Sequence, residues 1–278
     1  MTFGTRLRAA MDSRGPLCVG IDPHPALLAA WGLADDVSGL ETFAMTAVDA
    51  LGGTAAVVKP QSAFFERHGS RGIEVLERTI MKARSLGALV VLDVKRGDIG
   101  STAQAYADAY LTALAPMAVD AITISPFLGF GSLEPMIATA LAHDAGVFVL
   151  ALTSNPEGAQ VQHATTGDGR TVAGAILAAI AARNAGAASL GSVGAVVGAT
   201  IGTTGEDLDV NGPLLVPGVG AQGGTADDVR RIFGAALRNV LPSSSRGILA
   251  AGPGTAALRG AAEKAASEFA ALVGPGAR

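Results

Sequence analysis

Hydrophobic residues of this chain gather in short continuous runs, which are separated by longer segments rich in Ala and Leu. Continuous apolar runs, rather than alternating ones, are typical of strands that are buried on both faces of a sheet. The pattern predicts eight such strands, at Leu17–Ile21, Ala55–Val58, Ala88–Asp93, Ala121–Ile124, Val147–Leu152, Ala195–Ala199, Leu214–Val216 and Asn239–Pro242.

The longer segments have helical character. We expect helices at Leu40–Leu51, Gly72–Leu86, Thr102–Leu114, Leu133–Ala142, Val172–Asn184, Ala226–Leu237 and Thr255–Val273. Strands that alternate with helices form a parallel sheet, and eight units in 278 residues favour closure into a (β/α)8 barrel, which typically takes about 250 residues. A doubly wound open sheet is the alternative that the pattern leaves.

No stretch gathers enough Gly and Pro to form an interdomain linker, so we expect residues 1–278 to form a single α/β domain. In a (β/α)8 TIM barrel its active site would lie at the C-terminal ends of the strands. Residues 1–14 carry charges in an amphipathic pattern without an apolar targeting segment. The uncharged stretch at 184–205 is too weakly apolar to predict a membrane span.

Composition narrows the classes of partner and cofactor. The chain has 20 basic and 24 acidic residues, a net charge of −4, which argues against a nucleic-acid partner. A single cysteine, Cys18, excludes an internal disulfide framework and a multi-cysteine zinc site, and it favours a reducing, cytoplasmic setting. No metal site is expected, because the four histidines lack metal-ligand spacing: His24, His68, His143 and His163.

Polar side chains stand where several of the predicted strands end. In a (β/α)8 barrel these ends form one rim, on which active sites are built. Six strands would therefore bring their polar residues to one mouth, namely Asp22, Lys59, Asp93 with Lys95, Ser154, Gln222 and Arg246. A single charge at a strand end usually just meets solvent, but six together indicate a functional site.

The densest polar cluster is Asp93-Val94-Lys95-Arg96-Gly97-Asp98. Residues two apart on a strand share a face, so Asp93 and Lys95 are predicted to point the same way, and the neighbouring carboxylates should keep Lys95 protonated. Asp98 can aim back at them or outward. Lys59, at the end of the adjacent strand, extends the series to Lys–Asp–Lys–Asp. A rim salt-bridge network without a catalytic role is the alternative.

A glycine-rich segment, Val216–Gly224, follows the seventh strand. Glycine lets backbone N–H groups approach a phosphate closely, and the loops after strands seven and eight are the usual phosphate site of such barrels. Arg246, in the next loop, can bind phosphate oxygens through two parallel hydrogen bonds. Together these features predict a phosphate site.

The segment from Asp93 to Asp98, with Thr102 downstream, resembles the D-x-K-x-x-D motif of the orotidine 5′-phosphate decarboxylase family. Four further segments resemble this family, at residues 19–24, 58–60, 152–157 and 217–224, so the resemblance covers nearly the whole chain. The longer spacing and the Thr-Ser-Asn-Pro segment are similar to a subgroup found in actinobacteria and some proteobacteria.

This resemblance implies loss of CO2 from orotidine 5′-phosphate to give UMP, the last step of de novo pyrimidine synthesis. It also implies no metal or organic cofactor, and a homodimer with sites at the subunit interface. Within the site, Lys95 would protonate the pyrimidine C6 carbanion, and Asp93 would lie beside the departing carboxylate.

The resemblance also implies the substrate contacts. Asp98 and Thr102 would reach the ribose in the partner subunit's site. The contacts within the subunit would be Lys59 and Asp22 with ribose hydroxyls, Ser154 with the pyrimidine edge, Gln222 between base and phosphate, and Gly223 and Arg246 with the phosphate.

Two other functions share features with this sequence. A Mg²⁺-dependent sugar-phosphate decarboxylase or aldolase of the same superfamily shares D-x-K-x-x-D, but it needs extra acidic ligands, and none adjoins Asp93 and Lys95. A non-catalytic sensor of nucleotide phosphates would be expected to lose Asp93, Lys95 or Asp98, and this chain keeps all three.

Overall fold

A computed structural model describes residues 1–219 and 224–273, and within these residues eight parallel strands form a closed barrel. The last strand pairs with the first through Cys18 and Ser243. The predicted (β/α)8 TIM barrel is thus confirmed, and the open sheet is wrong. The strands are β1 (Cys18–Ile21), β2 (Val57–Pro60), β3 (Leu89–Arg96), β4 (Ala121–Ile124), β5 (Gly146–Leu152), β6 (Val193–Val197), β7 (Leu214–Pro217) and β8 (Val240–Ser244).

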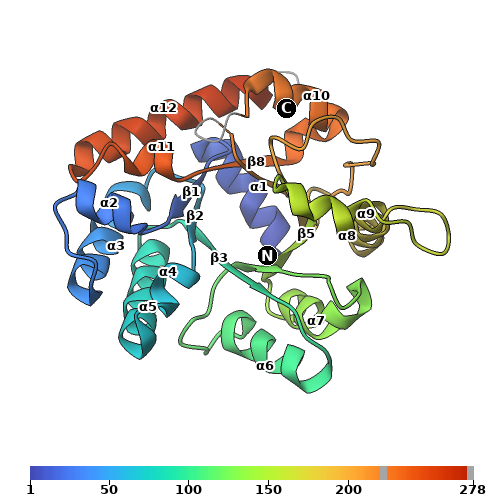
Figure 1. Ribbon diagram of the computed structural model, residues 1–278, viewed down its shortest axis with the longest axis horizontal. Helices are drawn as coiled ribbons and strands as arrows, with labels where there is room; N and C mark the ends of the chain where they lie inside the picture. The colour runs from blue at the N-terminus through green and yellow to red at the C-terminus, as the bar shows by residue number, and fades with distance from the viewer. Residues whose placement is uncertain (220–223, 274–278) are drawn as a thin grey trace.

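Helices surround the strands, and α12 lies along one edge of the molecule (Figure 1). The α-helices are α1 (Phe3–Arg14), α2 (Pro25–Ala30), α3 (Val37–Leu51), α4 (Ala63–Glu66), α5 (Gly69–Ser85), α6 (Gly100–Leu111), α7 (Glu134–Ala142), α8 (Ala159–Gln162), α9 (Val172–Arg183), α10 (Ala226–Phe233), α11 (Arg246–Leu249) and α12 (Thr255–Val273). Among the described residues, no helix is long and apolar enough to cross a membrane.

The predicted elements are found with shifted ends. The helix expected over Ala226–Leu237 is α-helical only to Phe233 and then continues as a 3₁₀ helix from Gly234 to Asn239. Gly234 has a φ of 42°, a left-handed conformation that ends the α-helix. The third strand runs three residues further than expected, to Arg96, and this extension carries Lys95 into the barrel rim.

Helix α1 closes the N-terminal end of the barrel. Its residues Phe3, Leu7 and Met11 are buried in one cluster with residues of the barrel interior, including Cys18 and Phe148. The rings of Phe3 and Phe148 meet edge to face with centroids 6.0 Å apart. Because this end is packed with side chains, the open space of the barrel lies at the opposite, C-terminal end of the strands.

Candidate active site

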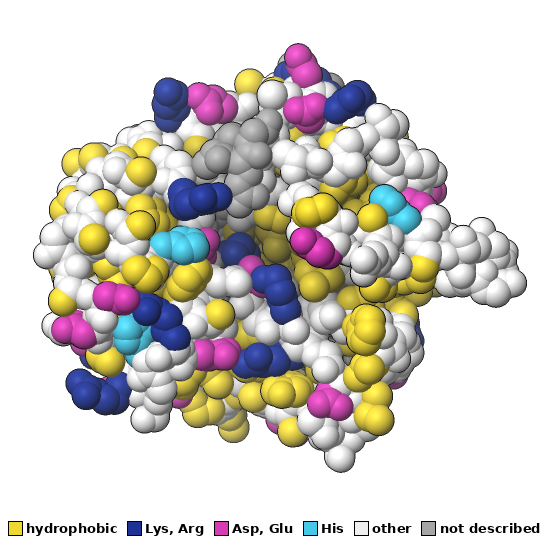
Figure 2. Space-filling view, viewed as in Figure 1, with side chains coloured by type: hydrophobic (Ala, Val, Ile, Leu, Met, Phe, Trp, Pro, Cys, Tyr) yellow, Lys and Arg dark blue, Asp and Glu magenta, His cyan; other side chains and the backbone are white. Residues whose placement is uncertain are grey.

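A pocket of about 520 Å³ opens at the C-terminal ends of the strands. Figure 2 shows the molecule hollowed near its centre, with basic and acidic side chains gathered in the hollow. All eight strands, or the loops that follow them, contribute residues to its lining. These residues are Asp22, His24, Lys59, Asp93, Lys95, Thr123, Leu150, Leu152, Thr153, Ser154, Asn155, Val196, Leu215, Pro217, Gly218, Val219, Ser243, Ser244, Ser245 and Arg246.

The structure brings most of the sequence-predicted site residues to this pocket. Those that line it are Asp22, Lys59, Asp93, Lys95, Ser154 and Arg246. Asp98 and Thr102 do not line the pocket, and Thr102 is exposed on α6. Gln222 and Gly223 lie outside the described residues.

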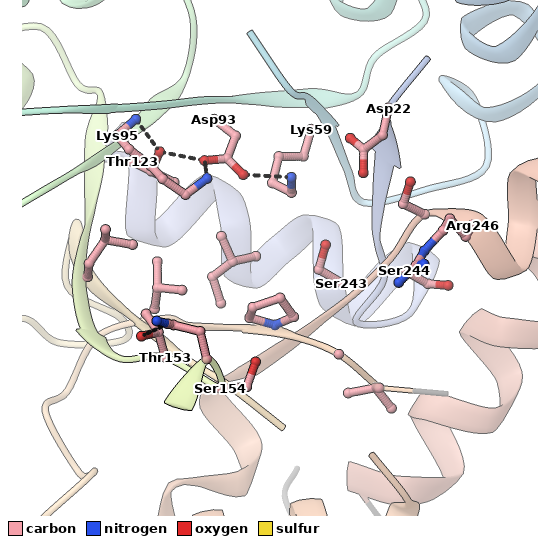
Figure 3. Close-up of a pocket in the computed structure, with 18 of the residues that line it drawn as sticks. Asp22, Lys59, Asp93, Lys95, Thr123, Thr153, Ser154, Ser243, Ser244 and Arg246 are labelled. Atoms are coloured by element: carbon pink, nitrogen blue, oxygen red, sulfur yellow. Dashed lines mark hydrogen bonds and ion pairs between the residues drawn. The ribbon is translucent and has the colours of Figure 1, made fainter. Parts of the chain in front are cut away.

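Asp93 lies between two lysines (Figure 3). Its Oδ2 accepts a hydrogen bond from Lys59 Nζ at 2.9 Å, and its Oδ1 accepts one from Lys95 Nζ at 2.7 Å. The side chains of Lys59 and Asp93 are 8% and 11% exposed, whereas that of Lys95 is 46% exposed. Lys95 is therefore the member of this triplet that can meet both a ligand and solvent.

The charges of the triplet stabilise one another. Burial alone would raise the pKa of Asp93, but the positive charges of Lys59 and Lys95 outweigh it and hold that pKa well below its usual range. Burial alone would lower the pKa of Lys59, but the nearby carboxylates of Asp93 and Asp22 outweigh it and raise that pKa above its ordinary value. At neutral pH, Asp93 is an anion and Lys59 is a cation.

The backbone of β3 is irregular where it carries Lys95. The register with β4 shifts between Leu92 and Arg96, and Lys95 has a φ of 46°, which is rare for a residue with a side chain. Gly97 follows, where a Cβ atom would lie 2.4 Å from the carbonyl oxygen of Ser125. Asp93 and Lys95 do point the same way, as predicted, since their side chains are hydrogen-bonded. An irregularity of the strand at this point, and not a regular strand, brings them together.

Two uncharged side chains complete the contacts of Asp93, and the sequence reasoning did not single them out. Thr123 Oγ1 donates to Asp93 Oδ1 at 2.8 Å. The Gln61 amide satisfies its neighbours when its nitrogen donates to Asp93 Oδ2 (2.5 Å) and its oxygen accepts from Lys95 Nζ (3.2 Å). Each carboxylate oxygen then accepts from one ammonium and one neutral donor, which fixes the orientation of the carboxylate.

Next to the triplet, two buried oxygens have no hydrogen-bond partner among the described residues. They are Asp22 Oδ1 and Ser245 Oγ, and both residues line the pocket. A buried polar atom normally has a partner, so both oxygens are suited to bind a ligand that carries hydroxyl groups. Ser245 belongs to the polar run after β8 and is a further residue that the sequence reasoning did not assign.

Arg246 lies across the pocket from Lys95 (Figure 3). It begins α11, separated from the end of β8 by Ser245 alone, and Ser243 and Ser244 line the same pocket. Gly218, after β7, has a φ of 97° and also lines the pocket. A guanidinium, two hydroxyls and a glycine-containing turn are groups that suit a phosphate.

Ser154 lies in the loop after β5, two residues past its end, between two neighbours held by hydrogen bonds. The backbone N–H of Thr153 donates to Gln162 Oε1 at 2.9 Å, and Gln162 Nε2 donates back to Thr153 Oγ1 at 2.7 Å. Thr153 Oγ1 also donates to Asn155 Oδ1 at 2.7 Å. These hydrogen bonds hold the loop that presents Ser154 to the pocket.

An apolar wall forms the remaining side of the pocket. It consists of Leu150, Leu152, Val196, Leu215 and Pro217, from strands β5, β6 and β7. The pocket therefore offers charge on one side and a hydrocarbon surface on the other. In the part of the chain that the structure describes, no group of three or more His, Cys, Asp and Glu residues could hold a metal ion.

Comparison with known proteins identifies the family. Residues 15–261 match the family model described as the orotidine 5′-phosphate decarboxylase / HUMPS family. The chain belongs to this family. Two curated orotidine 5′-phosphate decarboxylases are similar over nearly their full length: that of Streptomyces coelicolor is 62% identical, covering 96% of each chain, and that of Salinispora arenicola is 64% identical, covering 98% of this chain and 99% of the relative.

Solved structures of the family share the fold of this chain. A Streptomyces avermitilis protein assigned as an orotidine 5′-phosphate decarboxylase matches with a TM-score of 0.96 and 61% identity, covering 98% of this chain and 96% of its own. The Leishmania donovani OMP decarboxylase matches with a TM-score of 0.75 and 30% identity, covering 98% and 99%. The family resemblance seen in the sequence, with relatives from actinobacteria, is thus confirmed.

Proposed function

We propose that this protein decarboxylates orotidine 5′-phosphate to UMP and CO2, the final step of de novo pyrimidine nucleotide synthesis. One observation carries the proposal: the ammonium of Lys95 is anchored by Asp93 at 2.7 Å, yet it remains open to the pocket. The relatives that carry this activity in their names are similar over nearly the whole chain.

The proposed chemistry uses no electron-sink cofactor. The bond between C6 and the carboxylate carbon breaks and CO2 leaves. The electron pair of that bond stays on C6, which becomes a poorly delocalised carbanion. A fixed cation beside C6 lowers the energy of that developing charge without having to reorganise. Lys95 then donates a proton from Nζ to C6, which gives UMP, and it regains a proton from solvent.

Asp93 has a different part in this proposal. It anchors the Lys95 side chain at 2.7 Å, and in this proposal it lies beside the place where the substrate carboxylate would sit. The apolar wall of Leu150, Leu152, Val196, Leu215 and Pro217 is a surface that suits uncharged CO2 better than a carboxylate. A surface that accommodates CO2 more readily than the substrate carboxylate promotes cleavage of the bond between C6 and the carboxylate carbon.

The rest of the nucleotide would be held by groups away from C6. Asp22 and Lys59 would bind ribose hydroxyls and Ser154 the pyrimidine edge, since all three line the pocket. Arg246, which also lines it, would bind the phosphate together with Gln222 and Gly223. Binding energy from these remote contacts can order the site around the reacting atoms, so it can assist the chemical step.

The experiment that tests this function is an absorbance assay with orotidine 5′-phosphate in buffer that contains EDTA. We expect the substrate absorbance to fall at a rate that EDTA does not change, with UMP and CO2 as products. Loss of the activity in EDTA and its return with Mg²⁺ would favour the metal-dependent alternative. Tight binding of UMP without any turnover of substrate would favour a sensor.

We further propose that the protein is a homodimer in which Asp98 and Thr102 enter the partner subunit's site. Both stand outside the pocket of their own subunit. Large apolar side chains are exposed after β3 and after β4. Ile99 follows Asp98 directly and is 62% exposed, and Phe127 and Leu128, just after β4, are 75% and 54% exposed. Apolar groups of this kind favour burial against another chain.

Mixing two inactive variants tests this arrangement. Lys95→Ala and Asp98→Ala homodimers should each have little activity, because every site lacks one of the two groups. After unfolding and refolding together, half of the dimers are mixed, and each mixed dimer has one intact site, so about a quarter of wild-type activity should return. No recovery, with mixed dimers shown to form, would place Asp98 in its own subunit's site or outside the site.

We also propose a cytoplasmic location. Cys18, the single cysteine of the chain, is a free and buried thiol in β1. Burial raises its pKa to about 12, so it stays protonated and unreactive. A chain without disulfides is suited to a reducing compartment.

A further inference from the structure

Thr123 is a polar residue inside an otherwise apolar strand. It lies on β4, between Ile122 and Ile124, and it is 1% exposed. Its side chain faces the barrel interior, on the same face as Ala121, whereas the two isoleucines pack in the core that contacts the helices. A buried hydroxyl in this position needs hydrogen-bond partners, and the structure provides two.

The first partner is the backbone of Lys95. The N–H of Lys95 donates to Thr123 Oγ1 at 2.9 Å. This N–H is in the bulge where the register between β3 and β4 shifts, so it has no regular place in the ladder of backbone hydrogen bonds. The Thr123 hydroxyl thus supplies an acceptor to a residue that has the uncommon φ of 46°.

The second partner is the carboxylate that holds the Lys95 ammonium. Thr123 Oγ1 donates a hydrogen bond to Asp93 Oδ1 at 2.8 Å. Asp93 Oδ1 also accepts a hydrogen bond from Lys95 Nζ at 2.7 Å. Figure 3 shows Thr123 beside both residues. One hydroxyl therefore fixes the two ends of Lys95, its backbone directly and its ammonium through Asp93.

We propose that Thr123 is a positioning residue for the decarboxylation. Its hydroxyl holds the bulge of β3 and the Asp93 carboxylate in one fixed relation, so that Lys95 Nζ stands where negative charge grows on C6. Thr123 itself need not touch the substrate. The inference rests on the proposed function and adds a residue to it.

The effect of Thr123 should appear in kcat more than in KM. Binding of the nucleotide depends on groups elsewhere in the pocket, such as Ser154 and Arg246. Positioning of the proton donor matters only as C6 becomes negative, and a displacement of about 1 Å can cost about 100-fold in rate. A residue whose removal lowers kcat and leaves KM unchanged acts in the transition state.

Thr123→Val removes the hydroxyl and keeps the shape of the side chain. We expect it to lower kcat by about 10- to 100-fold with KM changed less than about threefold. Thr123→Ser keeps the hydroxyl and should restore kcat to within about threefold of wild type. Thr123→Ala is the second variant without a hydroxyl, and it should show the same loss as Thr123→Val.

Thr79→Val is the matched control. Thr79 is also fully buried and its hydroxyl donates to Val75 O at 2.7 Å, but it lies on α5 and does not line the pocket. It should keep wild-type kcat, and calorimetric titration with UMP should show that all soluble variants retain a folded site.

Three results would overturn the inference: kcat within about threefold of wild type in Thr123→Val or Thr123→Ala, a Thr123→Ser variant as slow as these two, or a rise in KM without loss of kcat. If the wild-type protein itself fails to convert orotidine 5′-phosphate, the proposed function is wrong. The two failures are therefore distinguishable.

Discussion

Replacing Lys95 with alanine is expected to lower kcat/KM for orotidine 5′-phosphate by about 10⁴-fold or more. The change removes a proton donor, which typically contributes about 10²- to 10⁴-fold, and it also removes the cation that faces the developing charge, which contributes about 10²- to 10³-fold. Asp93 keeps its contacts with Lys59 and Thr123, so the protein should still fold. The absorbance assay with purified protein measures the effect.

Lys82→Ala is the control for this substitution. Lys82 lies on α5, and its exposed side chain pairs with Asp49 at 2.8 Å, remote from the residues that line the pocket. It should keep the wild-type rate. A Lys95→Ala variant that stayed within tenfold of wild type would show that another group delivers the proton.

Asp93→Asn is expected to reduce both activity and stability. It leaves the buried ammonium of Lys59 without the charge that faces it at 2.9 Å, and loss of one member of a buried ion pair costs about 3 to 5 kcal/mol. Lys95 also loses its anchor, so kcat should fall by at least about 100-fold. Urea unfolding at pH 7 and the absorbance assay measure the two effects.

The difference in free energy of unfolding between wild type and Asp93→Asn should become smaller as the pH is lowered into the acid range. The folded pKa of Asp93 lies below its usual range, whereas an unfolded aspartate titrates near about 3.9. The contribution of this carboxylate is therefore fully present above that value and is lost as the pH falls below about 4. The difference should be constant from about pH 6 to 8 and shrink in acid.

An exposed aspartate provides the comparison for stability. Asp168 also has a pKa well below its usual range, chiefly because Arg170 donates hydrogen bonds to it, but both side chains are about half exposed. Solvent screens such a pair, so Asp168→Asn should leave the free energy of unfolding nearly unchanged. An Asp93→Asn variant with an equally small effect, or a difference that grows in acid, would contradict the buried-pair description.

The barrel could be predicted from the sequence because its strands are buried on both faces. Runs such as Ala121–Ile124 are continuous and apolar, and their number and spacing leave few architectures. The residues at their ends followed from the same reasoning, since parallel strands bring these ends to one rim. This is why Asp22, Lys59 and Asp93 could be placed together before any geometry was known.

Features that depend on packing between distant segments could not be predicted. The amphipathic pattern of residues 1–14 did not show that α1 closes the barrel, because this role depends on Phe3 packing against Gly146 and Phe148. The bulge at Lys95 depends on the register of β3 against β4, which no local pattern records. Polar residues near Lys95 also made the third strand look shorter than it is.

Thr123 was missed for another reason. The sequence prediction rested on polar residues that follow the predicted strands, whereas Thr123 is a polar residue inside a strand. A hydroxyl within a run that is buried on both faces is itself a signal, because it must be satisfied by a hydrogen bond. Asp98 and Thr102 illustrate the opposite limit: they lie outside the pocket of this chain, and a single chain does not test their proposed place in a partner subunit's site.

A crystal structure of the protein with bound UMP tests the central claim most directly. We predict that the pyrimidine ring lies in the hollow of the barrel, with C6 within about 3.5 Å of Lys95 Nζ and the phosphate against Arg246. A complex in which the ring binds elsewhere, or in which Lys95 Nζ points away from C6, would contradict it.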